Sequence, residues 1–160
     1  MPGTLKLVVA FSVGLFLPCC SRPHVRPELE GVYRSARAVE ASLAVGVTLS
    51  DFSSLIREMS TQLLLARDQQ RFAGIPDPPV GRLLDKYAEI LQMYQDSGNL
   101  WQCQIQPDKG CPEASLIRAK YSATVYDPDA LRQIIWTQAS KAQETQIRAL
   151  FTGIESPRSR

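Results

Sequence analysis

Four cysteines carry the most specific chemistry in this 160-residue chain. Cys19 and Cys20 follow an apolar stretch, and thiols beside a membrane segment are sites of lipid attachment. Cys103 and Cys111 flank the turn sequence Pro-Asp-Lys-Gly at 107–110. Two thiols on either side of a turn favour a disulfide in an oxidising compartment. We therefore expect a lipid acceptor in the first pair and a structural disulfide in the second.

The first 19 residues have the pattern of an export signal. Lys6 supplies the positive charge, and residues 7–17 form the apolar run. This run is too short to cross a bilayer, which requires roughly 20 apolar residues. Leu17 and Cys19 stand three residues and one residue before Cys20, so the segment resembles the end of a bacterial lipoprotein signal. The resemblance implies that Cys20 is lipidated. Two alternatives are Cys19 as the acceptor and an ordinary cleaved signal whose cysteines are incidental.

This signal sets the expected domain organisation and address. We predict a signal peptide over 1–19, a lipid-anchored Pro-rich tether over 20–27, a helical bundle domain over 28–153 and a disordered tail over 154–160. The mature protein would be held in the cell envelope by its N-terminal lipid. It would face the periplasm or the cell exterior, with the outer membrane favoured over the inner.

Few residues are candidates for catalytic or cofactor chemistry. The one histidine, His24, falls in the tether, so the predicted helices offer none for a catalytic triad, a haem or a di-iron centre. A structural zinc site requires about four ligands, which is more than Cys103 and Cys111 supply. We therefore expect no enzyme activity, no cofactor and no metal.

Two groups of carboxylates have structural explanations. Asp85 and Glu89 are four residues apart, but Arg82 and Lys86 surround them, as on a solvated helix face. In the run Asp-Pro-Asp at 127–129, the first aspartate can cap a helix that begins at the proline. Neither group indicates an acid/base pair.

The net charge excludes one class of partner. The chain has 18 Lys and Arg and 16 Asp and Glu, and Lys6 leaves with the signal, so 17 cations face 16 anions and the mature net charge is +1. No basic cluster is longer than Arg158-Ser159-Arg160. Nucleic-acid binding requires a concentrated basic surface, so we expect no nucleic-acid partner.

Apolar residues at helical spacing predict four main amphipathic helices. Their stripes are Leu29, Val32, Ala36, Val39, Leu43 and Val47; Phe52, Leu55, Ile56, Met59, Leu63 and Ala66; Leu83, Leu84, Tyr87, Ile90, Leu91, Tyr94 and Trp101; and Leu131, Ile134, Ile135, Ala139, Ala142, Ile147, Leu150 and Phe151. A short helix around 116–121 precedes the last, unless a proline kink joins the two in one bent element. The expected fold is all-α: an up-down bundle of four main helices plus a short helix, with one disulfide-clipped loop.

Local signals predict where these helices begin and end. Gly46 is a C-terminal stop for the first helix, and Thr48 or Ser50 can cap the second. The first two helices should pair antiparallel because their connection is short. Residues 74–79 include three prolines and should form the longest interhelical loop.

Three further patterns predict packing depth. Leu64 and Leu65 widen the apolar face of the second helix, which should therefore be the most buried. The polar, Ala-rich middle of the last helix, 138–146, should be thinly packed or lie at the surface. Gly98 lies on the apolar face of the third helix, where it should ease a close helix crossing or mark a bend.

The tryptophans and the segment after the first helix carry a resemblance. Residues 46–55, the stretch from Tyr94 to Trp101 and the pattern Trp136-x-x-Ala139 are together similar to small all-helical bacterial lipoproteins. The resemblance implies the fold class and the envelope address, but no functional residues. Core packing explains the two tryptophans, and the alternative is that Trp101 or Trp136 lines a groove.

These observations favour a non-enzymatic, lipid-anchored helical domain that binds a protein or serves the cell envelope. One alternative is an envelope inhibitor, immunity-type or chaperone module with one specific partner. Another is a small-ligand carrier or hydrolytic domain that uses a groove between helices.

Overall fold

The computed structural model describes residues 25–74, 77–106 and 111–152, with side chains through 148. Within these ranges the chain forms five helices and no strand, which confirms the all-α class. The helices are α1 (Pro27–Val45), α2 (Leu49–Phe72), α3 (Pro78–Ile105), α4 (Pro112–Lys120) and α5 (Pro128–Thr152). No helix among the described residues is both long enough and apolar enough to cross a bilayer.

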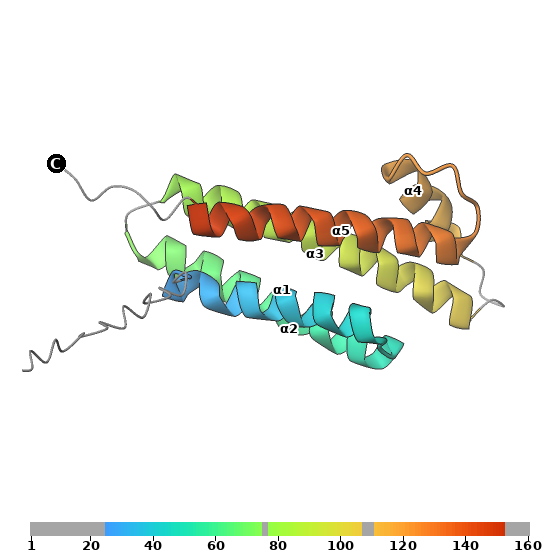
Figure 1. The fold of residues 1–160 in the computed structure, drawn as a ribbon, viewed down its shortest axis with the longest axis horizontal. Coiled ribbons are helices and arrows are strands. Elements are labelled where there is room, and N and C mark those ends of the chain that lie inside the picture. The colour runs from blue at the N-terminus through green and yellow to red at the C-terminus, as the bar shows by residue number, and fades with distance from the viewer. Residues whose placement is uncertain (1–24, 75–76, 107–110, 153–160) are drawn as a thin grey trace, which may run out of the picture.

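The four long helices run up and down as a bundle (Figure 1). α1 packs along α2, α2 along α3 and α3 along α5, whereas α1 and α5 approach each other at few positions. The short α4 lies against α3 near the start of α5. We call the end that contains the start of α1, the end of α2 and the start of α3 the proximal end. The opposite end, with the α1–α2 turn, the end of α3 and α4, is the distal end.

Local residues set the helix boundaries as the sequence predicts. Gly46 follows α1 with a φ of +91°, a conformation that glycine adopts without strain. Thr48 caps α2, since its Oγ1 accepts a hydrogen bond from the Asp51 backbone N–H at 3.2 Å. Asp127 caps α5 in the same way, with its Oδ2 accepting from the Ala130 N–H at 3.0 Å. The last two helices are therefore separate elements and not one bent helix.

The prediction that residues 74–79 form the longest loop is wrong. Pro78 and Pro79 belong to the first turn of α3, where a residue has no intrahelical hydrogen bond to donate. Asp77 caps this helix and accepts from the Val80 N–H at 3.3 Å. The remaining connection, 73–77, is shorter than the connections at 106–111 and 121–127.

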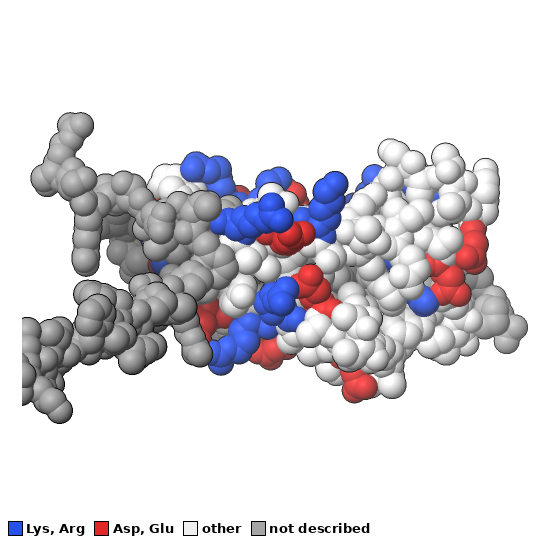
Figure 2. All heavy atoms as spheres, viewed as in Figure 1, with Lys and Arg blue, Asp and Glu red and all other residues white. Residues whose placement is uncertain are grey.

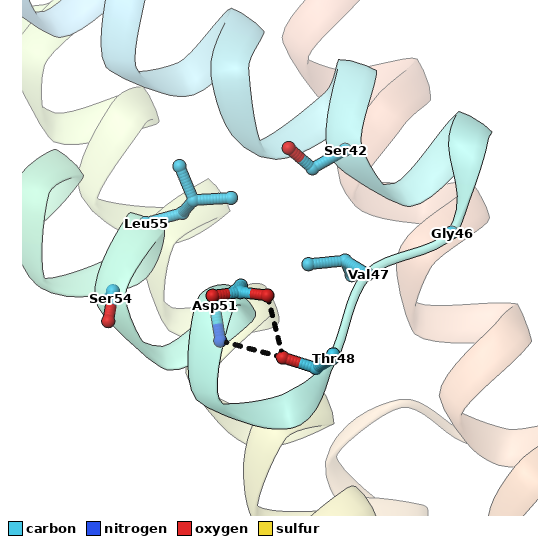
Figure 3. A pocket seen from close by; sticks show the side chains of 7 residues that line it. All are labelled: Ser42, Gly46, Val47, Thr48, Asp51, Ser54 and Leu55. Carbon is cyan, nitrogen blue, oxygen red and sulfur yellow. Dashed lines mark hydrogen bonds between the residues drawn. The ribbon is translucent and has the colours of Figure 1, made fainter.

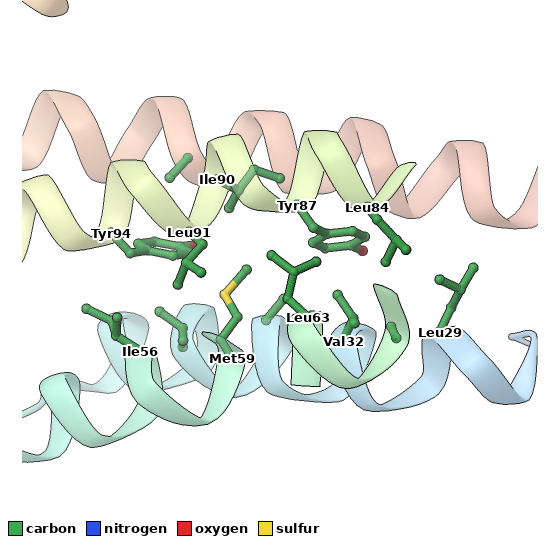
Figure 4. Close-up of a cluster of buried hydrophobic side chains, with 14 of the residues drawn as sticks. Leu29, Val32, Ile56, Met59, Leu63, Leu84, Tyr87, Ile90, Leu91 and Tyr94 are labelled. Carbon is green, nitrogen blue, oxygen red and sulfur yellow. The ribbon is translucent and has the colours of Figure 1, made fainter. Parts of the chain in front are cut away.

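An apolar core fills the centre of the bundle (Figure 4). Its largest fully buried side chains include Phe52, Met59, Leu84, Tyr87, Ile90 and Tyr94. A smaller cluster of Leu100, Ile117, Leu131 and Ile135 closes the distal end, where α4 covers α3 and α5.

The most buried helix is α3 and not α2. Nine residues of α3 are buried, against five of α2. Leu64 and Leu65, expected to widen the buried face of α2, are 59% and 50% exposed. The reason is position: α3 contacts α2, α4 and α5, whereas the outer side of α2 faces solvent.

Gly98 lies at a close crossing between α3 and α2. A Cβ placed on Gly98 would lie 3.6 Å from Phe52 Cε1 and 3.8 Å from Ile56 Cδ1. α3 continues through this position without a break, so Gly98 marks a crossing.

The middle of α5, 138–146, predicted to be thinly packed or surface-lying, buries one stripe of side chains and leaves the rest partly or fully exposed. Ala139 and Gln143 are both fully buried. Together with Leu131 and Ile135 they form one buried stripe, in which successive residues are four positions apart. The polar side chain of Gln143 can be buried because its amide forms hydrogen bonds with Tyr94 and Glu40.

Candidate functional site

The disulfide predicted from the sequence is present. Cys103 and Cys111 are bonded through their sulfurs, with their Cα atoms 5.3 Å apart. The bond joins the last turn of α3 to the residue before α4 and closes the connection between them. Glu113 lies close to both sulfurs, but sulfurs bonded to each other offer no thiolates to a metal ion. This group is therefore a structural clip.

Trp101 and Trp136 form the centre of an aromatic cluster with Phe52. The two indole rings meet edge to face with centroids 5.9 Å apart, and the Phe52 ring lies 5.8 Å and 5.9 Å from them. The Arg132 guanidinium lies over both tryptophans, 4.7 Å and 5.0 Å from their centroids. The rings pack against each other and the Arg132 side chain, which supports the core-packing interpretation over the groove.

Hydrogen bonds fix this cluster in place. The Trp136 Nε1–H donates to Ser97 Oγ at 2.8 Å, and the Ser97 hydroxyl donates to the Tyr94 carbonyl at 2.7 Å. Arg132 donates to Gln104 Oε1 at 2.7 Å and also pairs with Asp129, while its Nε is buried without a partner among the described residues. The guanidinium is therefore held by its terminal nitrogens and by the indole faces.

A polar group that is buried at Tyr94 and Gln143 and partly exposed at Glu40 and Ser140 joins α1, α3 and α5. The Gln143 Nε2–H donates to Glu40 Oε2 at 3.2 Å, and the Tyr94 hydroxyl donates to Gln143 Oε1, also at 3.2 Å. Ser140 donates to the other Glu40 oxygen at 3.0 Å, and Arg37 forms an ion pair with the same carboxylate. We call Glu40, Tyr94, Ser140 and Gln143 the polar bridge. Its hydrogen-bonding groups are occupied by one another, as expected for a structural element.

Burial alters the acidity of the bridging phenol. The pKa of Tyr94 is raised well above its ordinary value, first because the hydroxyl is buried and second because the Glu40 charge is near. A neutral hydroxyl is what the bridge requires, because Tyr94 must donate a proton to Gln143. Tyr94 therefore stays protonated near neutral pH.

A second polar cluster surrounds Asp96, beside α4. Its carboxylate is nearly buried and accepts from Lys120 Nζ at 2.6 Å, the Tyr121 hydroxyl at 2.8 Å and Gln92 Nε2 at 3.0 Å. Burial, followed by the hydrogen bond to Asp96, raises the pKa of Tyr121. Donors from α3, α4 and the residue after α4 thus converge on both carboxylate oxygens of Asp96.

The Asp96 cluster borders a hollow of about 440 Å³ between α3, α4 and α5. Ser122, on its rim, has a φ of +50°, which is unusual for a residue with a side chain. The hollow is lined by Glu89, Gln92, Met93, Lys120, Tyr121, Ser122 and Gln138. Most of its lining residues are polar by type, and those that belong to the Asp96 cluster bind one another.

A larger hollow of about 710 Å³ opens at the α1–α2 turn (Figure 3). Asp51 and Thr48 lie on its floor, and the Thr48 hydroxyl donates to Asp51 Oδ2 at 2.8 Å. These polar atoms form the N-cap of α2, and this structural role accounts for their presence. The lining residues are Ser42, Gly46, Val47, Thr48, Asp51, Ser54 and Leu55.

The carboxylates singled out from the sequence lie where a structural explanation predicts. Asp85 pairs with Arg67 at 2.9 Å, and Glu89 pairs with Lys86 at 2.8 Å, all on exposed surface. The carboxylates at 127 and 129 belong to the start of α5. None of these groups is brought together with another acid in a cleft of the described structure.

Several predicted features lie outside the described residues. These are the lipid acceptor Cys20 with its alternative Cys19, the tether histidine His24, the signal over 1–19 and the tail over 154–160. At the domain boundary, Pro27 is already the first residue of α1, one residue before the predicted start at 28.

Sequence reasoning missed the polar bridge and the Asp96 cluster. One signal for the bridge was available: Gln143 occupies a stripe position four residues after Ala139, where an apolar residue is the rule. Asp96 had no comparable signal, because its partners come from α4, 24 and 25 residues later.

Comparisons with known proteins give no match from which a function could be inferred, so any functional proposal depends on the fold and on these sites. No protein-family model, curated protein or solved structure matches the chain significantly.

Proposed function

We propose that this protein is a non-enzymatic helical domain, anchored in the cell envelope by a lipid on Cys20, that binds another protein through the distal end of its bundle. The domain would face the periplasm or the cell exterior. Cys19 is the alternative acceptor.

One observation carries the binding role: large apolar side chains are exposed at the distal end. Val45 is 86% exposed, Ile105 57%, Leu116 72% and Tyr126 81%. They come from the end of α1, the end of α3, α4 and the residues before α5, which share this end of the molecule. Exposed apolar side chains gathered in one region are typical of protein-interaction surfaces.

The charge distribution and the shape of the surface also favour the distal end as the binding surface. On the face shown in Figure 2, most of the Lys and Arg side chains and several acidic ones lie in the proximal half, and the other half is mostly uncharged with a few charged groups. The hollow of about 710 Å³ at the α1–α2 turn also opens at the distal end. A partner there would meet apolar side chains and a concave surface with little charge to desolvate.

The disulfide supports an address outside the cytoplasm. Disulfides persist where the environment is oxidising and are rare in cytosolic proteins. The polar groups of the bridge and of the Asp96 cluster bind one another, which supports a binding role over a catalytic one.

The anchor is tested by mass and fractionation. The full chain should be recovered in the membrane fraction with a lipid mass on its N-terminal cysteine, and Cys20→Ser should release it as an unlipidated protein. Cys19→Ser is the matched control and should remain lipidated. A Cys20→Ser protein that stays membrane-bound with an unchanged mass would refute the anchor.

The binding end is tested by photocrosslinking in intact cells. A photoreactive amino acid at position 116 or 126 should capture a protein partner, whereas the same group at position 64 should not. Leu64 is the matched control because it is apolar and 59% exposed but lies on the outer side of α2. Capture from position 64 and not from 116 or 126 would contradict the distal surface.

A further inference from the structure

An exposed apolar tip lies at the proximal end of the bundle. Phe72, the last residue of α2, is 87% exposed, and Ala73, Gly74 and Pro78 beside it are exposed as well. No described helix covers this ring. The tip also carries a cation, Arg71, whose side chain is 81% exposed.

The tether enters the fold at the same place. Arg26, the residue before α1, forms an ion pair of 2.5 Å with Asp77 in the α2–α3 connection. Six residues lie between Cys20 and Pro27, and an extended chain over those seven steps spans at most roughly 25 Å. A lipid on Cys20 would therefore keep the tip that contains Phe72 close to the bilayer surface.

The tip presents an accessible cation, Arg71. Arg71 lies 3.9 Å from Asp68, the longest of the described ion pairs, so its guanidinium is largely free to contact phosphate. The charge of Asp77 is compensated by Arg26, whose hydrogen bond lowers the pKa of the Asp77 carboxyl, and Asp68 lies one helical turn before the tip. A hollow of about 610 Å³ beside Arg71 is lined by Gln70, Arg71, Gly74, Asp77, Pro78 and Gly81.

We infer that the proximal tip docks on an anionic phospholipid surface, with the Phe72 ring in the boundary between headgroups and acyl chains and Arg71 on the phosphates. An aromatic ring beside an arginine is a combination that lies stably at this boundary. The lipid on Cys20 would hold the domain near the bilayer, and contact of the tip with the bilayer would orient the domain. The inference therefore rests on the proposed anchor. Docking would hold the distal end away from the membrane, where a partner can reach it.

The test uses a tryptophan as a depth probe in the full lipidated protein. Phe72→Trp is reconstituted in vesicles of phosphatidylethanolamine and phosphatidylglycerol that contain brominated acyl chains, and quenching is compared with that of Val45→Trp. Val45 is the matched control because it is 86% exposed at the opposite end of the bundle. The wild type supplies the background from Trp101 and Trp136. We expect severalfold more quenching of the probe at 72 than of the probe at 45.

A second measurement addresses the charge. In the unlipidated Cys20→Ser protein, Arg71→Gln should weaken partitioning to the same anionic vesicles about fivefold, the value of one interfacial arginine. Arg57→Gln removes another exposed arginine, in the distal half of α2, and should leave partitioning unchanged.

The outcomes separate this inference from the proposed anchor. A lipidated, vesicle-bound protein with equal quenching at positions 72 and 45 overturns the docking and leaves the anchor standing. A chain with no lipid on Cys20 overturns the anchor, and the quenching comparison is then made on the unlipidated chain with the vesicles. Greater quenching at 72 there supports the tip as a lipid-binding surface, and equal quenching overturns it.

Discussion

The Tyr94 hydroxyl donates to Oε1 of Gln143 at 3.2 Å and so joins α3 to α5 in the interior of the bundle. Gln143 in turn donates to Glu40 on α1, although the backbones of α1 and α5 approach each other at few positions. Long polar side chains therefore span the one wide side of the bundle. A buried polar network of this kind favours one packing arrangement, because any other leaves its members unpaired.

Replacing Gln143 should destabilise the protein through its partners. In Gln143→Leu the side-chain volume is kept, but the Tyr94 hydroxyl loses its acceptor, and Glu40 Oε2 loses one donor and keeps Arg37 as the other. We expect a loss of about 2 kcal/mol in the free energy of unfolding, measured by urea denaturation.

The double variant distinguishes lost hydrogen bonds from poor packing. Tyr94→Phe combined with Gln143→Leu removes the unpaired hydroxyl, so the double variant should be more stable than the sum of the two single changes predicts. Strict additivity would show that Tyr94 and Gln143 are not coupled.

The disulfide should contribute measurably to stability. Cys103 and Cys111 are eight residues apart, and closing a loop of that length stabilises the folded chain by about 2.5 kcal/mol in the chain-entropy model. The variant with serine at both positions should unfold at correspondingly lower urea. Reductant should lower the stability of the wild type and leave that of the double variant unchanged, and an unaffected wild type would contradict the bond.

The features predicted correctly are those that depend on neighbours along the chain. Gly46, Thr48 and Asp127 act within one turn of a helix, so their residue type is enough to place a boundary. The pairing of Cys103 with Cys111 is equally local, because the turn between them brings the thiols together.

The features missed depend on which helix lies beside which. Leu64 and Leu65 would be buried if another helix covered the outer side of α2, and the spacing of apolar residues does not show that none does. Gln143 is buried because Tyr94 and Glu40, 49 and 103 residues earlier, meet it there. The spacing of apolar residues shows which face of a helix is apolar, but only the tertiary arrangement shows which helix, if any, covers that face.

Gly98 and Gly46 should respond in opposite directions to alanine. A Cβ at 98 would meet Phe52 at an ordinary contact distance of 3.6 Å, so Gly98→Ala should stabilise α3 by up to about 1 kcal/mol. Gly46 has a φ of +91°, where an L-residue is strained, so Gly46→Ala should destabilise the protein by about 1 kcal/mol. Thermal denaturation of both variants measures the two shifts, and a lower melting temperature for Gly98→Ala would show that the crossing needs glycine.

The buried phenols should make the protein sensitive to alkali. Burial is the first cause of the raised pKa of Tyr87, Tyr94 and Tyr121, so the folded state holds these hydroxyls neutral at a pH where the unfolded chain ionises them. Their contribution to stability is complete below the ordinary tyrosine pKa of 10.0 and is lost as the pH rises above it toward the folded-state values.

The free energy of unfolding should therefore fall steeply above pH 10, and the phenolate absorbance should appear together with unfolding. Tyr87→Phe is the informative control: the Tyr87 hydroxyl is buried without a hydrogen-bond partner among the described residues, so its removal costs no bond. This variant should lose less stability between neutral pH and alkaline pH than the wild type does. An equal loss in both proteins would show that Tyr87 does not contribute to the alkaline transition.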